Sequence, residues 1–401
     1  MKIVQVEDFF HPDAGYQINI ISKFFVKFGH EVTIITSELD KVPESLTSFF
    51  GRDNIEERDN EYSNKYGVKI IRLPVRSYIS NRAYFYGKIF DVIKAEHPDV
   101  VFVHGNDRLL GMQYLLKLKK MDYPLIMDNH MLEMASNNKF NKLFWRWYKM
   151  FITPIIVKNG ITVIRTQDDP FVNKRLGIPE SLTPWLSVGS DTLLFYPDSN
   201  IRKSFREENG IAEDSIVVLY AGKIDKEKGG KLLGELTSKK LSVNKDIVFV
   251  IVGKTNGEYG EEIEAMFKSS PYRVLRFPTQ RYSDLANFYQ ASDIAVFPKQ
   301  CSLSFYDVQA CGLPVVFEDN NINVDRAINN NAFTFKSDSI DDFRNVLSEI
   351  INKDPEEFER IKQNSIDYVR QNYDYEPISR EYIKEIENSV KHYKESKNGR
   401  K

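Results

Sequence analysis

Short apolar runs alternate with longer amphipathic stretches along most of the chain. The runs are rich in β-branched residues and have the length of buried strands. They lie at residues 2–6, 31–36, 68–73, 99–105, 124–130 and 161–166 and, after an interruption, at residues 215–222, 246–254, 272–278, 293–298 and 313–318. Strands and helices that alternate in this way predict an α/β fold, with parallel sheets covered by helices on both faces.

The stretches between the runs have the period of amphipathic helices. Over residues 16–30 an apolar stripe extends from Ile18 to Phe28, and Gly29 follows it as a stop signal. Further helical patterns close the chain over residues 340–352, 355–372 and 376–393. We therefore expect helices between the strands and a purely helical C-terminal part.

A polar stretch with turn residues interrupts the alternation, and we expect a linker near residues 190–212. A chain of 401 residues exceeds the size at which one core stops growing. The predicted division is two Rossmann-like domains, over residues 1–195 and 205–375, followed by a C-terminal helix over residues 376–401. Ligands of such folds bind beyond the carboxyl ends of the strands, so two facing domains imply a cleft lined by the loops that follow strands.

Composition narrows the class of protein only a little. Apolar residues make up 42% of the chain and charged residues 28%, which is ordinary for a soluble globular protein. A formal charge of -2 gives no reason to expect nucleic acid as the main partner. Two cysteines are too few for a disulfide framework, and no Cys/His spacing suggests a zinc site. This cysteine usage fits a reducing, cytoplasmic location, and we expect neither a secretory signal nor a membrane span.

Histidines follow two of the predicted strands. His104 comes after one apolar run, and Asp128 and His130 come after the next. A lone histidine is more often structural, but two at the same edge of one sheet favour a functional role, for His130 more than for His104. His11 is a further candidate, because it lies in the loop after the first strand.

Gly15, in the same loop, allows close backbone approach beside a helix N-terminus, where an anion can bind. An ordinary strand-to-helix turn explains it equally well. Lys223 and Lys228 bracket a turn after the first strand of the second half, just before a glycine pair that opens a helix. Two cations beside a helix N-terminus favour a diphosphate clamp over a solvated basic turn.

The segment between residues 298 and 313 is unusually polar for a link between two core strands. A short helix is expected over residues 304–310, with Ser302 or Ser304 as its N-cap. Capping accounts for one serine but not for both. Asp307, one turn inside the helix, is expected to accept hydrogen bonds from a vicinal diol such as ribose.

A different kind of pattern occurs near residue 145. Basic residues spaced three, four and three apart share one helical face: Lys139, Lys142, Arg146 and Lys149. Aromatic residues, among them Trp147, lie on a neighbouring face. This mixture suits the headgroup region of an anionic membrane, and a core helix with a basic edge explains it equally well. Nucleic acid is not supported by the rest of the chain.

Several motifs follow one another over about 300 residues: "FHPDAGYQIN", "GHEVT", "PDVVFVHG", "YPLIMDNH", "VGSDTLLFYP", "AGKIDKEKGG" and "ASDIAVFP…ACGLPVV". In their order and spacing the chain resembles the retaining glycosyltransferases of family 4, which have the GT-B fold and use nucleotide sugars. The resemblance implies two facing Rossmann-like domains, an N-terminal one for the acceptor and a C-terminal one for the donor. It also implies a C-terminal helix that crosses back to the N-terminal domain.

The resemblance also implies roles for single residues. Gly15 would lie against the donor, His130 near the reacting sugar, and Lys223 and Lys228 on the diphosphate. Asp307 would hold the ribose. Further donor contacts, through serine hydroxyls and backbone amides, are expected from Ser302, Leu303, Ser304 and Phe305. On the acceptor side the candidates are His11, His104 and Asp128.

The chain departs from the family pattern in one donor-site segment. The first glutamate of the family's glutamate pair is missing, and the segment before Asp307 is about three residues shorter than usual. Ala14 likewise replaces the first glycine of the N-terminal pair. We therefore expect residues 298–307 to determine which sugar is transferred. The sequence does not distinguish UDP-linked from GDP-linked donors.

Transfer in this family is generally described as a metal-independent front-face displacement, and no Asp-x-Asp motif is present to hold a metal. The basic–aromatic helix favours a polyprenyl-diphosphate-linked saccharide as acceptor, used in surface-polysaccharide assembly at the inner face of the plasma membrane. A soluble acceptor, or a non-catalytic module that binds sugar nucleotides or glycans, are the alternatives.

Overall fold

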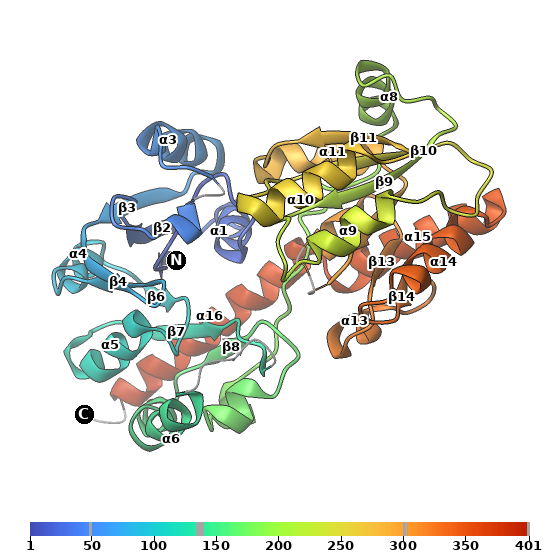
Figure 1. Cartoon of the computed structure of the whole chain (residues 1–401). Helices are drawn as coiled ribbons and strands as arrows, with labels where there is room; N and C mark the ends of the chain where they lie inside the picture. Colours follow the sequence, from blue (N-terminus) through green and yellow to red (C-terminus); the bar gives the residue numbers. More distant parts are fainter. Residues whose placement is uncertain (48–49, 134–139, 300–301, 303, 399–401) are drawn as a thin grey trace. The chain divides into compact units, whose positions relative to one another are not determined.

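The computed structural model describes residues 1–47, 50–133, 140–299, 302 and 304–398. The chain forms two compact units, one made of Met1–Val188 with Glu376–Lys401 and one made of Gly189–Tyr375. Residues 189–195 thus belong to the second unit. Each unit contains its own six-stranded parallel sheet, which confirms the predicted fold class (Figure 1).

The sheet of the first unit has the strand order β3-β2-β1-β6-β7-β8. Its strands are β1 (Lys2–Val6), β2 (Glu31–Ser37), β3 (Lys69–Leu73), β6 (Val100–Val103), β7 (Leu125–Asn129) and β8 (Val163–Arg165). The helices are α1 (Gln17–Lys27), α2 (Glu44–Thr47), α3 (Ile55–Tyr66), α4 (Ile89–Ala95), α5 (Leu109–Lys117), α6 (Asn141–Phe151) and α7 (Thr153–Asn159), with short turns η1 (Leu118–Lys120), η3 (Phe171–Arg175) and η4 (Glu180–Leu182). The central strands are apolar because helices bury both faces of the sheet.

An antiparallel hairpin, β4 (Val75–Ile79) and β5 (Arg82–Phe85), was not expected from the sequence. Its two-residue turn, Ser80 and Asn81, has positive φ at both positions. Such a turn matches the twist of a hairpin, but it is usually recognised by a glycine, which is absent here.

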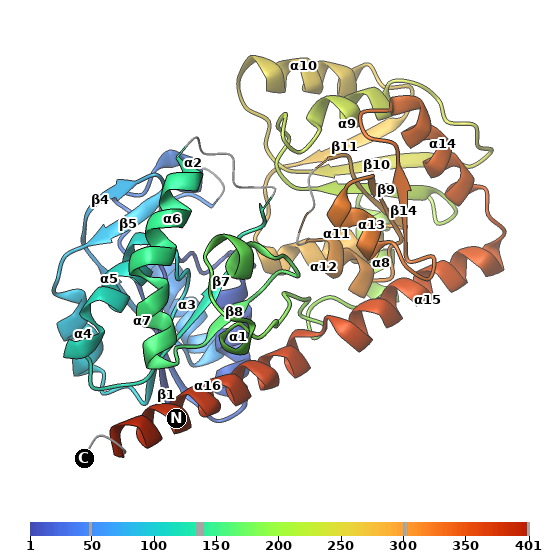
Figure 2. The same cartoon turned by 90° about the horizontal axis from the view of Figure 1, so that it is seen from below.

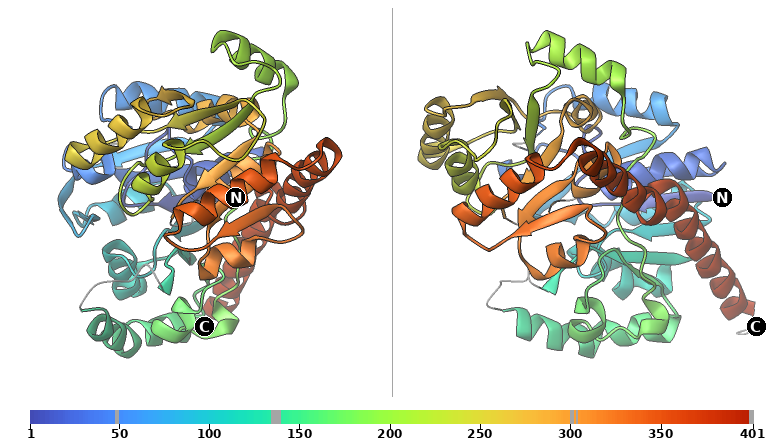
Figure 3. Two further views of the ribbon diagram at one scale, coloured as in Figure 1. Left: turned by 45° about the vertical axis from the view of Figure 1, so that its right-hand side comes forward. Right: turned by 90° about the vertical axis from the view of Figure 1, so that its right-hand side faces the viewer.

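The sheet of the second unit has the order β11-β10-β9-β12-β13-β14. Its strands are β9 (Ile216–Ala221), β10 (Ile247–Val252), β11 (Arg273–Phe277), β12 (Ile294–Phe297), β13 (Val315–Glu318) and β14 (Ala332–Phe335). The helices are α8 (Ser199–Glu208), α9 (Gly230–Thr237), α10 (Gly257–Lys268), α11 (Leu285–Ala291), α12 (Ser304–Ala310), α13 (Asn321–Arg326), α14 (Ile340–Ile351) and α15 (Pro355–Asn372), with the turn η5 (Tyr282–Asp284). Figure 3 shows α9 and α10 side by side on one face of this sheet, where they share a core with α14.

The predicted linker at residues 190–212 is wrong in one respect, because α8 lies within it. The Asp198 side chain caps this helix by accepting hydrogen bonds from the first-turn amides. Arg206 is buried and forms an ion pair of 2.7 Å with Asp293, which attaches α8 to the second unit. Some polar residues of this stretch thus form hydrogen bonds and ion pairs within the second unit and do not face solvent.

The C-terminal helix α16 (Tyr375–Asn398) packs on the first unit, as the resemblance implied. Glu376 pairs with Lys27 of α1 at 2.6 Å, and Tyr382 accepts a hydrogen bond from Gln17. Figure 2 shows the helix running past α1 and β1. The last helix in the chain therefore completes the cover of the first sheet.

Candidate functional site

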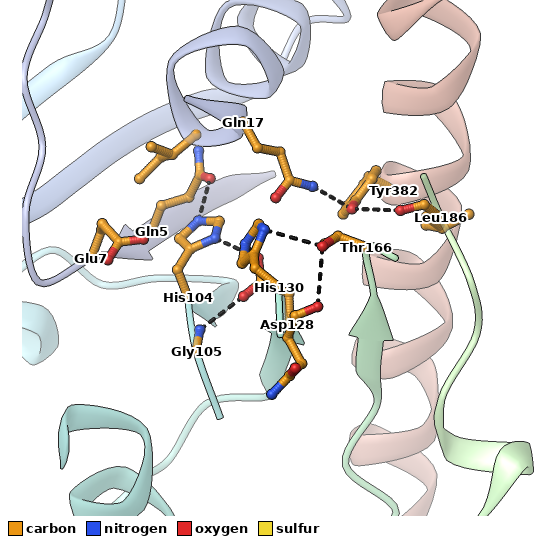
Figure 4. A network of polar contacts seen from close by, with 12 residues as sticks. Gln5, Glu7, Gln17, His104, Gly105, Asp128, His130, Thr166, Leu186 and Tyr382 are labelled. Carbon is orange, nitrogen blue, oxygen red and sulfur yellow. Dashed lines mark hydrogen bonds and ion pairs between the residues drawn. The ribbon is translucent and has the colours of Figure 1, made fainter. Parts of the chain in front are cut away.

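The ends of β6 and β7 bring His104, Asp128 and His130 together. His104 Nδ1 lies 2.6 Å from Asp128 Oδ2, and His130 Nε2 lies 3.2 Å from the same oxygen. Parallel neighbouring strands end at the same edge of a sheet, so side chains 24 residues apart in sequence meet here. The structure thus places the predicted histidines on one shared carboxylate (Figure 4).

The Asp128 carboxylate is fully buried yet well stabilised. Burial alone would raise the pKa of Asp128, but the adjacent His104 and His130 hold it well below the ordinary value. The amide of Gly105 donates to Asp128 Oδ1 at 2.8 Å. The carboxylate is therefore ionised and fixed in place at the edge of the first sheet.

A second layer of partners orients the two imidazoles. His104 Nε2 lies 2.9 Å from Gln5 Oε1, so both ring nitrogens of this buried histidine meet acceptors. His130 Nδ1 lies 3.1 Å from the Thr166 hydroxyl. Only His130 is partly exposed, with 30% of its side chain accessible, so it is the member of the group that a ligand can reach.

These three side chains could also be considered as metal ligands. Among the described residues they form one group whose potential ligand atoms all lie within 4.8 Å of one another. The atoms that a metal would need are, however, already hydrogen-bonded to one another and to Gln5, Gly105 and Thr166. The geometry accordingly fits a hydrogen-bonded network better than a metal site.

A second buried carboxyl group, Asp8, was missed by sequence reasoning. It follows β1, and both of its oxygens are buried without a hydrogen-bond partner among the described residues. Burial raises the pKa of Asp8 to about 7, and the positive charge of Arg108, which pairs with the neighbouring Glu7, opposes this rise. The sequence signal that could have revealed Asp8 is the pair of acidic residues directly after an apolar strand.

The other two candidates of the first unit lie in the loop between β1 and α1. His11 is buried, stacks on Phe50 with 4.9 Å between ring centroids, and accepts a hydrogen bond from the amide of Asp13. In the described part of the chain, no hydrogen bond joins it to the network of His104, Asp128 and His130. Gly15 is half-buried and lies two residues before α1, in the position expected from the sequence.

In the second unit, Lys223 and Lys228 lie in the loop between β9 and α9. Lys223 is exposed and Lys228 is half-buried. The Asp225 carboxylate accepts from the Lys228 amide at 2.8 Å and shapes the turn. Gly229 has a φ of +75°, and a Cβ there would lie 2.9 Å from Pro298 Cβ. The glycine therefore lets the lysine loop lie against the residues that follow β12.

Helix α12 has the bounds predicted from the sequence. The Ser302 hydroxyl accepts from the Ser304 amide at 3.3 Å, and Phe305 is buried, whereas Leu303 lies outside the described residues. Asp307 is also buried. Its Oδ1 accepts from the Ser190 hydroxyl at 2.7 Å and from the Tyr282 hydroxyl at 3.2 Å.

These two partners of Asp307 were missed, because Ser190 is 117 residues away in sequence. Burial is the largest cause that raises the pKa of the Tyr282 hydroxyl, and the negative charge of Asp307 adds to it. The ribose contact of Asp307 stays a prediction, since Oδ1 already accepts two hydrogen bonds within the second unit.

Helix α6 carries the basic and aromatic residues. Lys142, Arg146, Trp147 and Lys149 are all exposed, and Lys139 lies outside the described residues. Beside them are exposed apolar side chains that a core helix would bury: Leu143 at 69%, Met150 at 67% and Phe151 at 52% exposed. Within α6 only Tyr148 is buried. In the part of the chain that the structure describes, no helix is both long and apolar enough to cross a bilayer.

Two family models match the chain, one in each unit. The model described as Glycosyltransferase Family 4 matches residues 15–157, and the model described as Glycosyl transferases group 1 matches residues 201–368. Together they include Gly15, the three residues His104, Asp128 and His130, the lysine loop and helix α12.

Individual proteins resemble this chain at low sequence identity and over short stretches. A D-inositol 3-phosphate glycosyltransferase of Catenulispora acidiphila is 29% identical over 140 residues, 32% of this chain and 33% of the relative. The lipopolysaccharide 1,2-N-acetylglucosaminetransferase of Salmonella typhimurium is 27% identical over 113 residues, 26% of this chain and 30% of the relative. The chain thus spans about a third of the length of these curated relatives.

A solved structure extends the similarity to the whole fold. Anabaena Alr3699/HepE, in complex with UDP and glucose, superimposes with a TM-score of 0.71 at 15% identity. The superposition covers 97% of this chain and 100% of that one. At this level of identity the likeness concerns the arrangement of strands and helices alone.

Proposed function

The chain belongs to family 4 of the glycosyltransferases and has the GT-B fold, and from this premise we propose that it transfers a sugar from a nucleotide-sugar donor to a saccharide acceptor. One observation carries the proposal. The two family models match the two halves in order, and each half contains its own parallel sheet of six strands. We propose a hexose or an N-acetylhexosamine as the transferred sugar, with retention of its anomeric configuration.

In the proposed reaction the second unit binds the donor. The bond between the anomeric carbon and the diphosphate oxygen breaks, and its electron pair stays on the diphosphate. Lys223 and Lys228 would stabilise the charge that develops there, each lowering the barrier by about 2.7–4 kcal/mol. No metal ion is required for this role, because the lysines supply the positive charge.

The acceptor hydroxyl attacks the same face of the anomeric carbon, and its proton passes to the departing diphosphate. The first unit would hold the acceptor and orient the reacting sugar. His130 is the natural contact, since its ring is partly exposed and Asp128 fixes its orientation. His104, which is buried, would act as a positioning residue through the shared carboxylate.

We further propose that the acceptor is a polyprenyl-diphosphate-linked glycan of O-antigen, capsule or exopolysaccharide assembly, used at the cytoplasmic face of the plasma membrane. Support comes from α6, where exposed basic side chains lie beside exposed Leu143, Trp147 and Met150. Such a surface matches an anionic headgroup layer.

Vesicle binding tests the membrane contact. Replacing Lys142, Arg146 and Lys149 with alanine should weaken binding to anionic vesicles, by about 1 kcal/mol for each charge that contacts the surface. A matched control removes three exposed lysines of α16: Lys384, Lys391 and Lys394. Equal loss in both triple variants, or no loss in either, would favour a soluble acceptor.

Hydrolysis of nucleotide sugars tests the transferase activity itself. We expect purified protein to release UDP or GDP slowly from at least one donor without an acceptor, and faster once a suitable acceptor is present. A protein that binds a donor tightly but never turns it over, with any acceptor offered, would instead be a binding module.

A further inference from the structure

Arg326, at the end of α13, is a buried cation without an acidic partner. Its residue is 8% exposed, and no carboxylate of the described residues forms an ion pair with it. With the described residues its guanidinium makes one hydrogen bond, from Nη1 to the Ser302 carbonyl oxygen at 3.5 Å. At that distance the bond is weak.

The other buried arginine of the second unit, Arg206, has different surroundings. Arg206 is 3% exposed, pairs with Asp293 at 2.7 Å, and donates to four backbone carbonyl groups. A buried guanidinium is costly unless it is paired and hydrogen-bonded. Arg206 meets this requirement inside the protein, whereas Arg326 does not meet it with any of the described residues.

Aromatic rings fix the position of the Arg326 guanidinium. Its central carbon lies 5.3 Å from the Phe305 ring centroid and 5.1 Å from the Tyr306 centroid. Stacking on rings satisfies the face of a guanidinium but not its N–H groups, which lie in the plane and suit a bidentate oxyanion. Since both rings belong to α12, the unsatisfied donors are held beside the start of that helix, next to Ser302.

We propose that Arg326 binds an anionic oxygen group of the donor, either a phosphate of the diphosphate or a carboxylate on the transferred sugar. The proposal rests on the proposed function, which supplies a nucleotide sugar as ligand. It adds a third cation to the lysine pair and makes Arg326 a donor-specificity residue. Asp307, the acidic residue of the same helix, forms no ion pair with Arg326 in the described part of the chain, and its Oδ1 accepts from Ser190 and Tyr282.

Calorimetric titration of the full chain tests this proposal. The probes are UDP and GDP, the matching nucleosides, and the donor pair UDP-glucose and UDP-glucuronate. In Arg326→Met, loss of a bidentate charged contact should weaken binding about 10- to 100-fold. Arg326→Lys keeps the positive charge but not the two parallel N–H donors of the guanidinium. Its affinity for the anionic probes should therefore lie between those of wild type and Arg326→Met. The nucleosides, which carry no anionic group, should bind all three proteins alike.

The donor pair separates the two sources of the anion. If Arg326 contacts the diphosphate, UDP, UDP-glucose and UDP-glucuronate all weaken to a similar degree. If it contacts a sugar carboxylate, only UDP-glucuronate weakens. Either pattern supports the proposal.

A purely structural role predicts a different result. In that case Arg326→Met or Arg326→Lys would lower the melting temperature while every probe kept its wild-type Kd, and the proposal would be overturned. A wild-type chain that binds no nucleoside diphosphate and no nucleotide sugar would overturn the proposed donor use as well. Arg326→Lys provides the answer if Arg326→Met does not fold.

Discussion

Asp128 and Arg326 are buried charges at the carboxyl ends of the two sheets, and their surroundings differ. In the first unit, Asp128 is surrounded by His104, His130 and the Gly105 amide, so its charge is balanced inside the protein. In the second unit, Arg326 is also buried, and the contacts of its guanidinium with described residues are two aromatic rings and one distant carbonyl oxygen. The Asp128 network at the first edge is complete without a ligand, whereas Arg326 at the second edge lacks an anionic partner among the described residues.

This difference indicates what each edge contributes to catalysis. A network that is satisfied internally can hold a reacting group in one orientation before any substrate arrives. A positive edge without its anion gains the missing interactions when a diphosphate binds. Substitutions of the buried residues at the first edge should therefore act mainly on stability, and substitutions at the second mainly on donor use.

The largest effect is expected at the centre of the first edge. Asp128→Ala leaves two histidines without their shared carboxylate and should lower the free energy of unfolding by about 3–5 kcal/mol. Urea denaturation at pH 7 measures this loss. His130→Ala is the control, and it should cost less because the ring is partly exposed. Equal and small losses in both variants would contradict a preorganised network.

The second edge should show the reverse behaviour. Lys228→Ala should lower kcat by about 100- to 1000-fold while the free energy of unfolding stays nearly unchanged, because the side chain stabilises charge that develops in the transition state. Lys226→Ala is the matched control, since Lys226 lies in the same turn and is exposed. Wild-type kcat in folded Lys228→Ala would remove this lysine from the proposed diphosphate clamp.

A smaller effect distinguishes the two buried carboxyl groups of the first unit. Burial raises the pKa of Asp8 from an ordinary value of 3.8 to about 7, so the wild-type protein loses stability as the pH rises through this interval. Asp8→Asn should therefore gain stability relative to wild type, by about 2 kcal/mol between pH 5 and pH 7.

Asp128 should show the opposite sign, because its pKa is lowered by the two histidines. Its contribution is present above the ordinary value of 3.8 and is lost as the pH falls below it. Unfolding free energies at four pH values between 5 and 8 test the Asp8 part. A stability difference between wild type and Asp8→Asn that does not change with pH would show that the Asp8 carboxyl is not perturbed.

Much of this arrangement could be predicted from the sequence, because strands that are buried on both faces leave a strong apolar signal. The ends of those strands located His104, Asp128 and His130 at one edge. The helix over residues 304–310 was also predictable, since it lies between two such strands.

The remainder depends on contacts that no local pattern records. Gln5 is a polar residue inside an apolar strand, which hinted at a buried partner but could not identify His104. Ser190 and Asp307 meet across 117 residues, and neither has a distinctive neighbourhood in sequence. Arg326 ends the short polar segment "NINVDR", which is indistinguishable from an exposed helix until its burial is known.

The central claim is that the second edge takes the diphosphate of a nucleotide sugar, and a thermal-shift screen tests it most directly. Wild-type protein, Lys228→Ala and Lys226→Ala are each heated with a panel of UDP- and GDP-linked sugars. At least one sugar nucleotide should raise the wild-type melting temperature, and at 100 times its Kd the stabilisation amounts to about 2.7 kcal/mol. The shift should persist in Lys226→Ala and shrink in Lys228→Ala. No shift with any member of the panel, or an equal shift in all three proteins, would contradict the account.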